Sequence, residues 1–250
     1  MTRPEPRTLT VTNSLRITPN MHRVTLGGDG YAGFPEGQDG GYVKLRLSEL
    51  LNAKDCVRTY TIRHQSTAGI EIDFALHGSG DTSGPATNWA VHAQNGDTIN
   101  VGGPGKAKPL PEGKGPFLLV GDMTALPAIS VNLEALPDDA VAHAIILVRD
   151  ARDKQEISAP AGVSVDWIVE PDLGTNPTLL ANAARQISKV DELAYVWVAC
   201  EFEAMKLLRQ FFRVEHGLGK EQLYISSYWK RGMVEDDHKR IKRVDAEAVG

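Results

Sequence analysis

The sequence has few of the features that mark secreted or metal-holding proteins. Its 250 residues include two cysteines, Cys56 and Cys200, which lie far apart and lack the spacing of a zinc site or a disulfide framework. The seven histidines are scattered, with no pair at metal-ligand spacing on one predicted element, so we expect no protein-held metal. Neither a Ser-His-Asp signature nor a paired-carboxylate motif is present.

Long apolar runs are also missing. No stretch approaches the roughly 20 apolar residues of a membrane helix, and the polar segment 1–7 lacks the apolar core of a signal peptide. The formal net charge of −5 argues against a general nucleic-acid-binding surface. We therefore expect a soluble, cytoplasmic protein that binds neither membrane nor nucleic acid. Because no assembly motif is evident, we also expect a monomer.

The first part of the chain is rich in short β-type segments. Polar and apolar residues alternate over 42–47 and 70–76, which is the period of a half-buried strand. Further β-rich runs cover 9–12, 22–26 and 96–104, and Gly and Pro turn signals separate the runs. The pattern predicts an antiparallel barrel or sandwich.

The pattern changes after a stretch rich in Pro, Gly and Lys at 106–116, which predicts a linker. Continuous apolar runs, typical of buried parallel strands, then alternate with helical segments. We predict strands at 117–120, 144–148, 164–169, 195–200 and 223–227, helices at 127–136, 177–188 and 202–216, and a charged terminal helix from Val234. This alternation predicts an α/β domain with a doubly wound parallel sheet, and divides the chain into domains 1–110 and 111–250.

The first candidate site is the segment Arg58-Thr59-Tyr60-Thr61-Ile62-Arg63. Residues two apart on a strand face the same side, so Arg58 and Tyr60 point together, with Thr61 opposite or at the strand end. A guanidinium suits a phosphate, an aromatic ring suits a flavin, and a Thr hydroxyl can bond the flavin edge. An ordinary polar strand accounts for the same short motif, so the segment alone does not distinguish a flavin site from a strand that binds no ligand.

Two further segments suit phosphate groups. Gly84-Pro85-Ala86-Thr87-Asn88-Trp89-Ala90 opens a predicted helix, whose first N–H groups and dipole favour a pyrophosphate, although an ordinary helix start reads the same way. Gly121-Asp122-Met123-Thr124-Ala125-Leu126-Pro127-Ala128 joins a strand to a helix at the usual place for a dinucleotide phosphate. It lacks the Gly-x-Gly-x-x-Gly fingerprint, and Asp122 or Thr124 can equally be plain helix caps.

The order of these pieces resembles the siderophore-interacting protein family, a flavin-dependent branch of the ferredoxin–NADP reductase superfamily. Four stretches carry the resemblance: 58–63, the block from His77-Gly78 to Ala90, 121–128, and Ser227-Tyr228-Trp229-Lys230-Arg231-Gly232. They span nearly the whole chain in the family's order. The resemblance implies a six-stranded antiparallel FAD-binding β-barrel, followed by a doubly wound parallel-sheet domain that binds NAD(P)H.

The resemblance also implies roles for individual residues. The FAD site would comprise Arg58, Tyr60, Thr61, Ile62, Arg63, His77, Gly84, Pro85, Ala86, Thr87 and Trp89. The NADH or NADPH site would comprise Gly121, Asp122, Thr124, Ala125, Leu126 and Glu201. Tyr228 and Trp229 would cover the flavin ring, with packing in the core as the alternative.

One position departs from the family pattern. Ala199-Cys200-Glu201 stands where the family usually has Ala-Gly-Glu, so Cys200 adds a side chain where the backbone approaches a ligand. We expect a buried, inert thiol, with a catalytic thiol as the alternative.

The resemblance implies NAD(P)H-dependent, FAD-mediated reduction of a ferric siderophore, which releases Fe(II), with no essential catalytic residue beyond the flavin. Ferric siderophores are often anionic, so a basic cluster of Lys44, Lys54 and Arg231 would attract them, unless these are ordinary solvated charges. A general flavin reductase with another acceptor, a ferredoxin as electron donor, and a non-enzymatic siderophore-binding protein stay open as alternatives.

The choice between NADH and NADPH depends on the strand end at 148–154. Arg149, Arg152 or Lys154 suits the 2′-phosphate of NADPH, whereas Asp150 suits the ribose hydroxyl of NADH. The residue types alone leave both nucleotides open.

Overall fold

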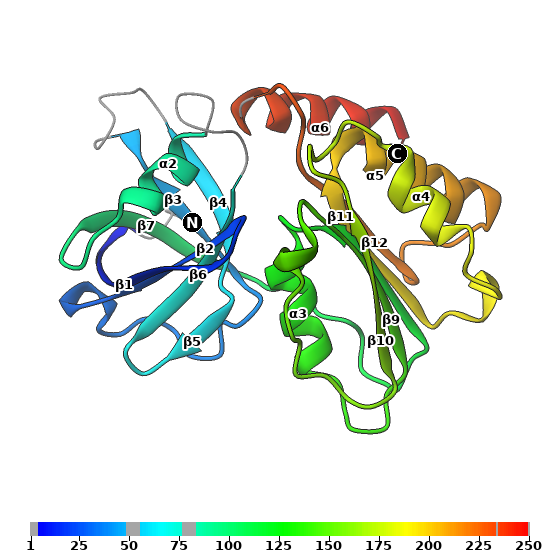
Figure 1. Cartoon of the computed structure of the whole chain (residues 1–250), viewed down its shortest axis with the longest axis horizontal. Helices are drawn as coiled ribbons and strands as arrows, with labels where there is room; N and C mark the ends of the chain where they lie inside the picture. Colours follow the sequence, from blue (N-terminus) through cyan, green and yellow to red (C-terminus); the bar gives the residue numbers. More distant parts are fainter. Residues whose placement is uncertain (1–4, 49–55, 77–83, 234, 250) are drawn as a thin grey trace. The chain divides into compact units, whose positions relative to one another are not determined.

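The chain divides into two compact units in a computed structural model that describes residues 5–48, 56–76, 84–233 and 235–249 (Figure 1). The first unit comprises residues 1–109 with 130–132, and the second comprises 110–129 with 133–250. The first is built on an antiparallel sheet and the second on a parallel one.

The antiparallel sheet of the first unit has the strand order β4-β3-β7-β1-β2-β6-β5. Its strands are β1 (Arg7–Thr18), β2 (Met21–Gly27), β3 (Tyr42–Arg46), β4 (Val57–Thr61), β5 (His64–Ser66), β6 (Gly69–Ala75) and β7 (Thr98–Gly105). A short 3-10 helix (Asp29–Tyr31) and α2 (Pro85–His92) complete the unit's regular structure among the described residues. The predicted fold class is confirmed. The described sheet has a seventh strand because three residues after β4 fold back onto β6 as β5.

The barrel closes where the end of β4 meets β6. The backbone N–H of Arg63, just after β4, donates to the carbonyl of Glu71 on β6 at 2.8 Å. The N–H of Ile62 donates to the carbonyl of Gly41 at 2.8 Å, which extends the pairing of β3 with β4. The segment 58–63 therefore forms the seam of the barrel.

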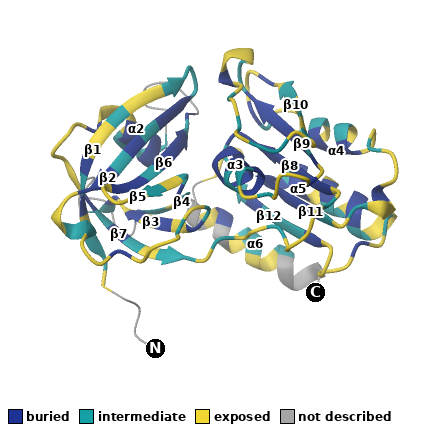
Figure 2. Cartoon of the chain, turned by 90° about the horizontal axis from the view of Figure 1, so that it is seen from below, coloured by how far each residue is buried: buried dark blue, intermediate teal, exposed yellow. Residues whose placement is uncertain are grey.

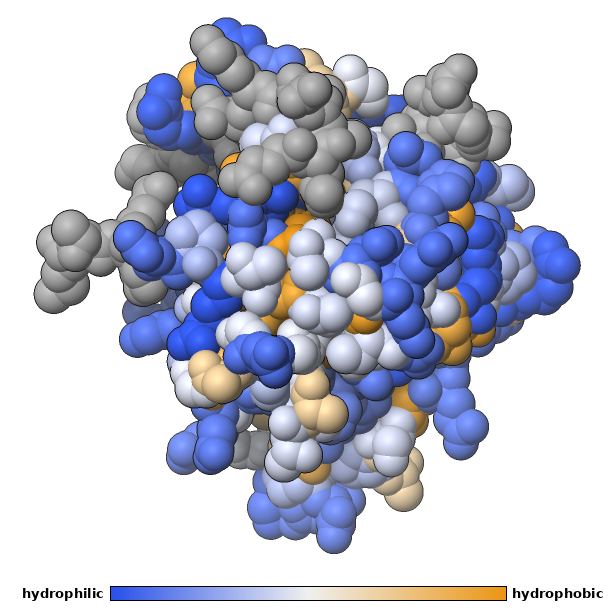
Figure 3. Space-filling view, turned by 90° about the vertical axis from the view of Figure 1, so that its left-hand side faces the viewer, coloured by the Kyte–Doolittle hydropathy of each residue, from blue (hydrophilic) through white to orange (hydrophobic). Residues whose placement is uncertain are grey.

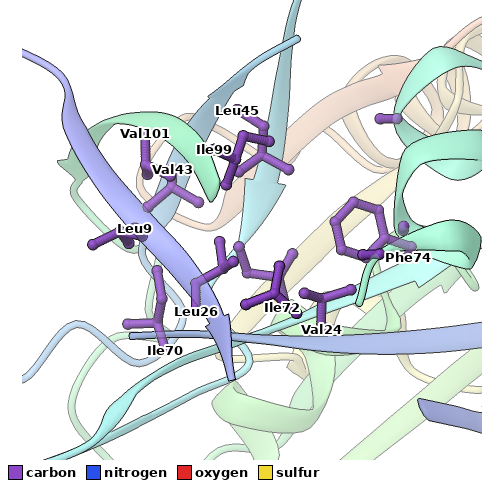
Figure 4. Packing of buried hydrophobic residues seen from close by; sticks show 14 of the residues in the cluster. Leu9, Val24, Leu26, Val43, Leu45, Ile70, Ile72, Phe74, Ile99 and Val101 are labelled. Carbon is purple, nitrogen blue, oxygen red and sulfur yellow. The ribbon is translucent and has the colours of Figure 1, made fainter. Parts of the chain in front are cut away.

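Alternating side chains fill the barrel. On β3, Val43 and Leu45 are fully buried, whereas Tyr42, Lys44 and Arg46 are exposed. Figure 4 shows aliphatic side chains from several strands packed against one another, with Phe74 beside Val24 and Ile72 at one end of the group. Burying each such side chain contributes about 1.5–3 kcal/mol. The first unit therefore has a hydrophobic core of its own.

The second unit is built on a parallel sheet with the order β10-β9-β8-β11-β12. Its strands are β8 (Phe117–Asp122), β9 (Ala142–Val148), β10 (Val163–Val169), β11 (Tyr195–Glu201) and β12 (Leu223–Trp229). Its α-helices among the described residues are α3 (Leu126–Glu134), α4 (Thr178–Ala184), α5 (Phe202–Arg209) and α6 (Glu235–Val249). α4 and α5 pack together on one face, with α3 on the other (Figure 1). The predicted doubly wound sheet is confirmed, and its central strands are largely buried (Figure 2).

Two predicted helices end differently in the structure. The helix predicted at 202–216 is α5 followed by a π-helical turn over Gln210–Glu215. The helix predicted at 177–188 ends at Ala184, because the N–H groups of Gln186 and Ile187 bond to carbonyls three residues back rather than four. The charged terminal segment forms α6, as predicted.

The surface is largely polar on the side of the molecule seen in Figure 3, where apolar side chains emerge only in small groups. Of the helices in the described part of the chain, none combines the length and apolar character needed to cross a bilayer.

The core of the first unit can be tested with a matched pair of truncations. Ile72 is fully buried, so Ile72→Ala should lower the free energy of unfolding by about 2–5 kcal/mol. Leu15 is 40% exposed, so Leu15→Ala should change it by no more than about 0.5 kcal/mol. Urea unfolding followed by circular dichroism measures both. Equal losses would show that Ile72 is not a core position.

Candidate functional site

Arg58 and Tyr60 share one face of β4, as predicted. In the register with β3, Tyr60 lies opposite Val43 and Arg58 opposite Leu45, the two buried positions of that strand. Both side chains are half-buried, so part of each remains accessible. The Arg58 Nη1 donates to the carbonyl of Val57 at 3.0 Å. Thr61 lies on the opposite face, across from the exposed Tyr42.

An aromatic row runs from β4 to α2. The Tyr60 and Phe74 rings lie 4.3 Å apart between centroids, and Phe74 lies 5.9 Å from Trp89 on α2. Tyr60 and Trp89 are half-buried against the core, whereas Phe74 is fully buried. The row thus presents partly accessible rings on a rigid base, which suits stacking by a planar ligand. Sequence reasoning missed Phe74, whose only signal was its place in an alternating strand.

The start of α2 has the properties of an anion site. Its N-cap residue, Gly84, supplies no side-chain cap, and Pro85 occupies the first turn. The first backbone bond of the helix runs from the N–H of Asn88 to the Gly84 carbonyl at 2.9 Å. The N–H groups of Ala86 and Thr87 precede that bond and lie at the positive end of the helix dipole. A pyrophosphate fits this donor set.

The remaining residues of the predicted FAD site differ in accessibility. Ile62 is fully buried in the barrel core, so its side chain can shape the site only through packing. Arg63 is half-buried, and its N–H is used in closing the barrel. His77 lies outside the described residues.

The loop between β8 and α3 lies at the topological switch point of the parallel sheet. The chain runs from β8 through β9 to β10, then crosses back to β11 and β12 on the other side of β8. Gly121 is required there, since a Cβ atom at that position would lie 2.7 Å from the carbonyl oxygen of Ala199 on β11. Ligands of open α/β sheets bind at this crevice, at the carboxyl ends of the strands.

Asp122, at the end of β8, joins the ends of three strands. Its Oδ1 accepts hydrogen bonds from the Thr124 N–H at 2.9 Å and the Thr124 hydroxyl at 2.5 Å. Its Oδ2 accepts from the Glu201 N–H and the Trp229 indole N–H, both at 2.8 Å. Burial raises the pKa of the Asp122 carboxyl, and these hydrogen bonds oppose the rise.

Glu201, at the end of β11, is also turned inward. Its Oε2 caps α5 by accepting from the N–H groups of Glu203 at 2.6 Å and Ala204 at 3.2 Å. Its Oε1 accepts from the Arg231 N–H at 3.2 Å. Glu201 is buried, so its carboxylate organises the backbone around it.

The loop after β10 is part of the same edge, and sequence reasoning missed it. Glu170 is buried and accepts from the Gly174 N–H at 2.9 Å and the Asn176 N–H at 2.7 Å. Gly174 has a positive φ of 77°, and a Cβ there would lie 3.0 Å from the Trp229 ring. The signal for this tight loop was the run Asp172-Leu173-Gly174-Thr175-Asn176-Pro177 directly after a predicted strand.

The other predicted nucleotide-binding residues are mostly buried. Gly121, Ala125 and Leu126 are buried, and Thr124 is partly accessible. The loop therefore offers a nucleotide mainly its backbone and Thr124, while Asp122 holds the loop in place.

Tyr228 and Trp229 have different environments. The Tyr228 ring packs edge-on against Trp197 at 6.4 Å, and burial raises the pKa of its hydroxyl well above the usual value. The Trp229 indole is half-buried and bonded to Asp122. Within this unit, Trp229 is thus part of the strand-end cluster, whereas Tyr228 packs against Trp197.

Cys200 is fully buried on β11. Burial, together with the charges of Asp122 and Glu201, raises the pKa of its thiol well above the usual value. A buried, protonated thiol is a poor nucleophile, as expected for an inert cysteine.

The proposed basic cluster is only partly described. Lys44 is exposed on the outer face of β3, away from Arg58 and Tyr60. Lys54 lies outside the described residues. Arg231 forms a two-bond ion pair with Asp172, with both distances 2.8 Å, and also donates to the Leu173 carbonyl at 2.8 Å. The charge of Arg231 is therefore largely compensated by Asp172.

Comparison with known proteins places both units in one group. Residues 115–232 match the model of the family described as siderophore-interacting protein, and residues 49–108 match the siderophore-interacting FAD-binding domain. The chain is 32% identical to ferric vibriobactin reductase ViuB of Vibrio cholerae serotype O1 over 260 aligned residues, covering 96% of this chain and 94% of that protein. It is 27% identical to the NADPH-dependent ferric-chelate reductase of Escherichia coli K12, with coverage of 89% and 92%.

A solved structure agrees over almost the full length. The siderophore-interacting protein SipS from Aeromonas hydrophila superposes with a TM-score of 0.83 at 28% identity, covering 97% of this chain and 98% of that one. The order of barrel and parallel sheet is thus shared by this experimental structure.

The role of Asp122 can be tested by Asp122→Asn. All four groups bonded to the carboxylate are donors, so an amide NH₂ in place of either oxygen would face two donors, at least one of them an N–H group. The substitution should lower the free energy of unfolding by about 1–3 kcal/mol, measured by urea unfolding, and change the fluorescence of Trp229. Asp138→Asn, at an exposed position, is the control and should do neither. If the two variants behave alike, Asp122 does not organise the strand ends.

Proposed function

Because the chain belongs to the siderophore-interacting protein family, we propose that it is an FAD-containing oxidoreductase that reduces ferric siderophores with electrons from NADH or NADPH. The relatives named ferric vibriobactin reductase and NADPH-dependent ferric-chelate reductase support this reaction class. The proposal extends their chemistry to this chain and leaves the siderophore itself undefined.

The observation that carries the proposal is the presence of two different sites in one chain. The first unit combines the aromatic row of Tyr60, Phe74 and Trp89 with the uncapped start of α2. The second unit has the β8–α3 loop at the switch point of a parallel sheet. A flavin site followed by a nucleotide site is the arrangement that a nicotinamide-dependent flavoprotein needs.

The donor set of the first unit fits FAD. The N–H groups of Ala86 and Thr87 suit the pyrophosphate, with the Arg58 guanidinium as a second phosphate partner. The half-buried Tyr60 and Trp89 rings suit the planar ring systems, and the Thr61 hydroxyl suits the flavin edge. When bound, FAD would supply the transfer of electrons from the nicotinamide to Fe(III).

The second unit contributes a prearranged loop rather than an acid or a base. In this proposal the backbone of the loop from Gly121 to Leu126 approaches the nucleotide, while Asp122 fixes the loop through its four hydrogen bonds, two of which come from Thr124. Because hydride and electron transfer need no protein acid or base, the inward orientation of Asp122 and Glu201 agrees with this chemistry.

The phosphate role of Arg58 has a direct test. Arg58→Ala should weaken FAD binding about tenfold or more, because a charge-assisted phosphate contact is lost. Fluorescence titration of the apoprotein with FAD measures the dissociation constant. Arg16→Ala removes an exposed arginine from the same unit and is the matched control. Unchanged FAD affinity in the Arg58 variant would remove Arg58 from the site.

The reaction can be tested by anaerobic stopped-flow spectroscopy. NADH or NADPH should bleach the flavin absorbance, and ferric siderophore added next should restore it and yield Fe(II) with a ferrous indicator. The siderophores should include catecholate, hydroxamate and carboxylate types.

Each negative outcome of that experiment identifies a different alternative. Bleaching without any ferrous product from the three types would indicate a general flavin reductase. If only a reduced ferredoxin, and neither NADH nor NADPH, bleached the flavin absorbance, the electron donor would be a ferredoxin. A colourless protein that does not bind FAD would indicate a siderophore-binding role and overturn the proposal.

A further inference from the structure

A small charged turn at residues 150–154 follows the carboxyl end of β9. β9 is the second strand of the β8–α3–β9 unit, and a 3-10 helix over Ala151–Asp153 follows it directly. In a dinucleotide-binding sheet, the residues at this strand end face the adenosine ribose. An acid there bonds the 2′-hydroxyl of NADH, and an arginine accepts the 2′-phosphate of NADPH.

The carboxylate of Asp150 is already occupied within this turn. Its Oδ1 accepts from the Arg152 N–H and from the Arg152 Nε, both at 2.9 Å. Its Oδ2 accepts from the Arg152 Nη2 at 2.7 Å. Both oxygens of Asp150 therefore have a partner inside the turn, and three of the about four acceptor sites of the carboxylate are taken, which leaves too few to accept from both hydroxyls of a ribose diol.

The turn is held rigid from its other end. The Asp150 N–H donates to the Asp153 Oδ2 at 3.0 Å, and the Asp153 N–H donates to the Asp150 carbonyl at 2.9 Å. Asp153 is fully buried and completes a reciprocal capping box. Its negative charge is thus turned into the protein, away from any ligand at the strand end.

Arg152 remains oriented outward. Its side chain is 74% exposed, against 33% for that of Asp150. Asp150 engages the Nε and one Nη2 hydrogen of the guanidinium, which leaves the Nη1 edge of the planar fork directed away from the carboxylate. A fixed guanidinium edge of this kind suits the oxygens of a phosphate monoester.

The neighbouring cations differ in how far they are engaged. Arg149 donates through Nε to the Pro171 carbonyl at 3.1 Å, which directs it toward the loop after β10. Lys154, the residue directly after the turn's 3-10 helix, is exposed. Arg152 and Lys154 thus outnumber the one accessible carboxylate, Asp150, so the exposed part of the turn favours an anion.

We infer that the turn at 150–154 is a 2′-phosphate site, which makes NADPH the preferred nucleotide, with Arg152 as the main contact and Lys154 adding charge. This inference rests on the proposed function for the use of the nucleotide, but not for its binding. The residue types alone leave both NADH and NADPH open, and the contacts within the turn favour NADPH.

The experiment compares two fragments that differ only in the 2′-phosphate, 2′,5′-ADP and 5′-AMP, by isothermal titration calorimetry on the full-length FAD-loaded protein. The wild type should bind 2′,5′-ADP about tenfold or more tightly than 5′-AMP. Arg152→Ala should abolish that ratio without changing the affinity for 5′-AMP, and Arg152→Lys should retain part of it. Equal affinities in the wild type, or an unchanged ratio in Arg152→Ala, would overturn the inference.

Two further variants make the result specific. Lys114→Ala removes an exposed lysine just before β8, at the amino ends of the parallel strands and so at the other end of the sheet from the turn. It should leave the ratio of the affinities for 2′,5′-ADP and 5′-AMP unchanged. Asp150→Asn should leave 5′-AMP binding unchanged. If it instead weakened 5′-AMP, the carboxylate would bond the ribose and the inference would be wrong.

Binding and reduction measurements on the same proteins show whether this inference or the proposed function fails. If 2′,5′-ADP binds as expected but no ferric siderophore is reduced, the proposed function fails and the phosphate site stands. If NADH reduces the flavin as efficiently as NADPH while ferric reduction proceeds, the proposed function stands and the inference fails.

Discussion

The edge of the second unit at which its parallel strands end depends on the buried carboxylate of Asp122. An isolated buried carboxylate costs several kcal/mol in lost hydration, and here four donors compensate for that loss. Those donors come from the loop between β8 and α3, the end of β11 and the end of β12, so one side chain fixes three parts of the sheet edge. Because the hydrogen bonds are satisfied only together, the loop at Gly121 has one favoured geometry.

The other acids at this edge extend the same arrangement. Glu201 caps α5 and Glu170 holds the loop at Gly174, so both carboxylates support backbone structure rather than face a substrate. In the described part of the first unit there is no such carboxylate at the start of α2, where the helix N–H groups have no side-chain cap. An inward-facing set of acids and an outward-facing set of donors both favour phosphate-bearing cofactors, and neither provides a general acid or base.

Much of the fold followed from local patterns, whereas many of the contacts did not. The alternation in 42–47 predicted which residues of β3 face the core, and the continuous apolar runs predicted the parallel sheet. Arg58 and Tyr60 were correctly placed on one face by the two-residue period. The inward orientation of Asp122 was not predictable, because it depends on Glu201 and Trp229, which lie 79 and 107 residues away in the chain. Likewise, Asp150 and Arg152 looked like rival ligands in the sequence until their ion pair showed that one engages the other. The ion pair between Asp172 and Arg231 was likewise not predictable, because the two residues lie 59 positions apart in the chain.

Transfer of electrons from the flavin of this chain to siderophore-bound iron can be measured without any nucleotide, in a single-turnover titration. The FAD-loaded protein is photoreduced under anaerobic conditions and mixed with a ferric siderophore and a ferrous trap. We expect full return of the oxidised flavin spectrum and about two trapped Fe(II) per flavin, because the flavin carries two electrons and each Fe(III) accepts one. A flavin that stays reduced in the presence of catecholate, hydroxamate and carboxylate complexes, with no Fe(II) trapped, would contradict it.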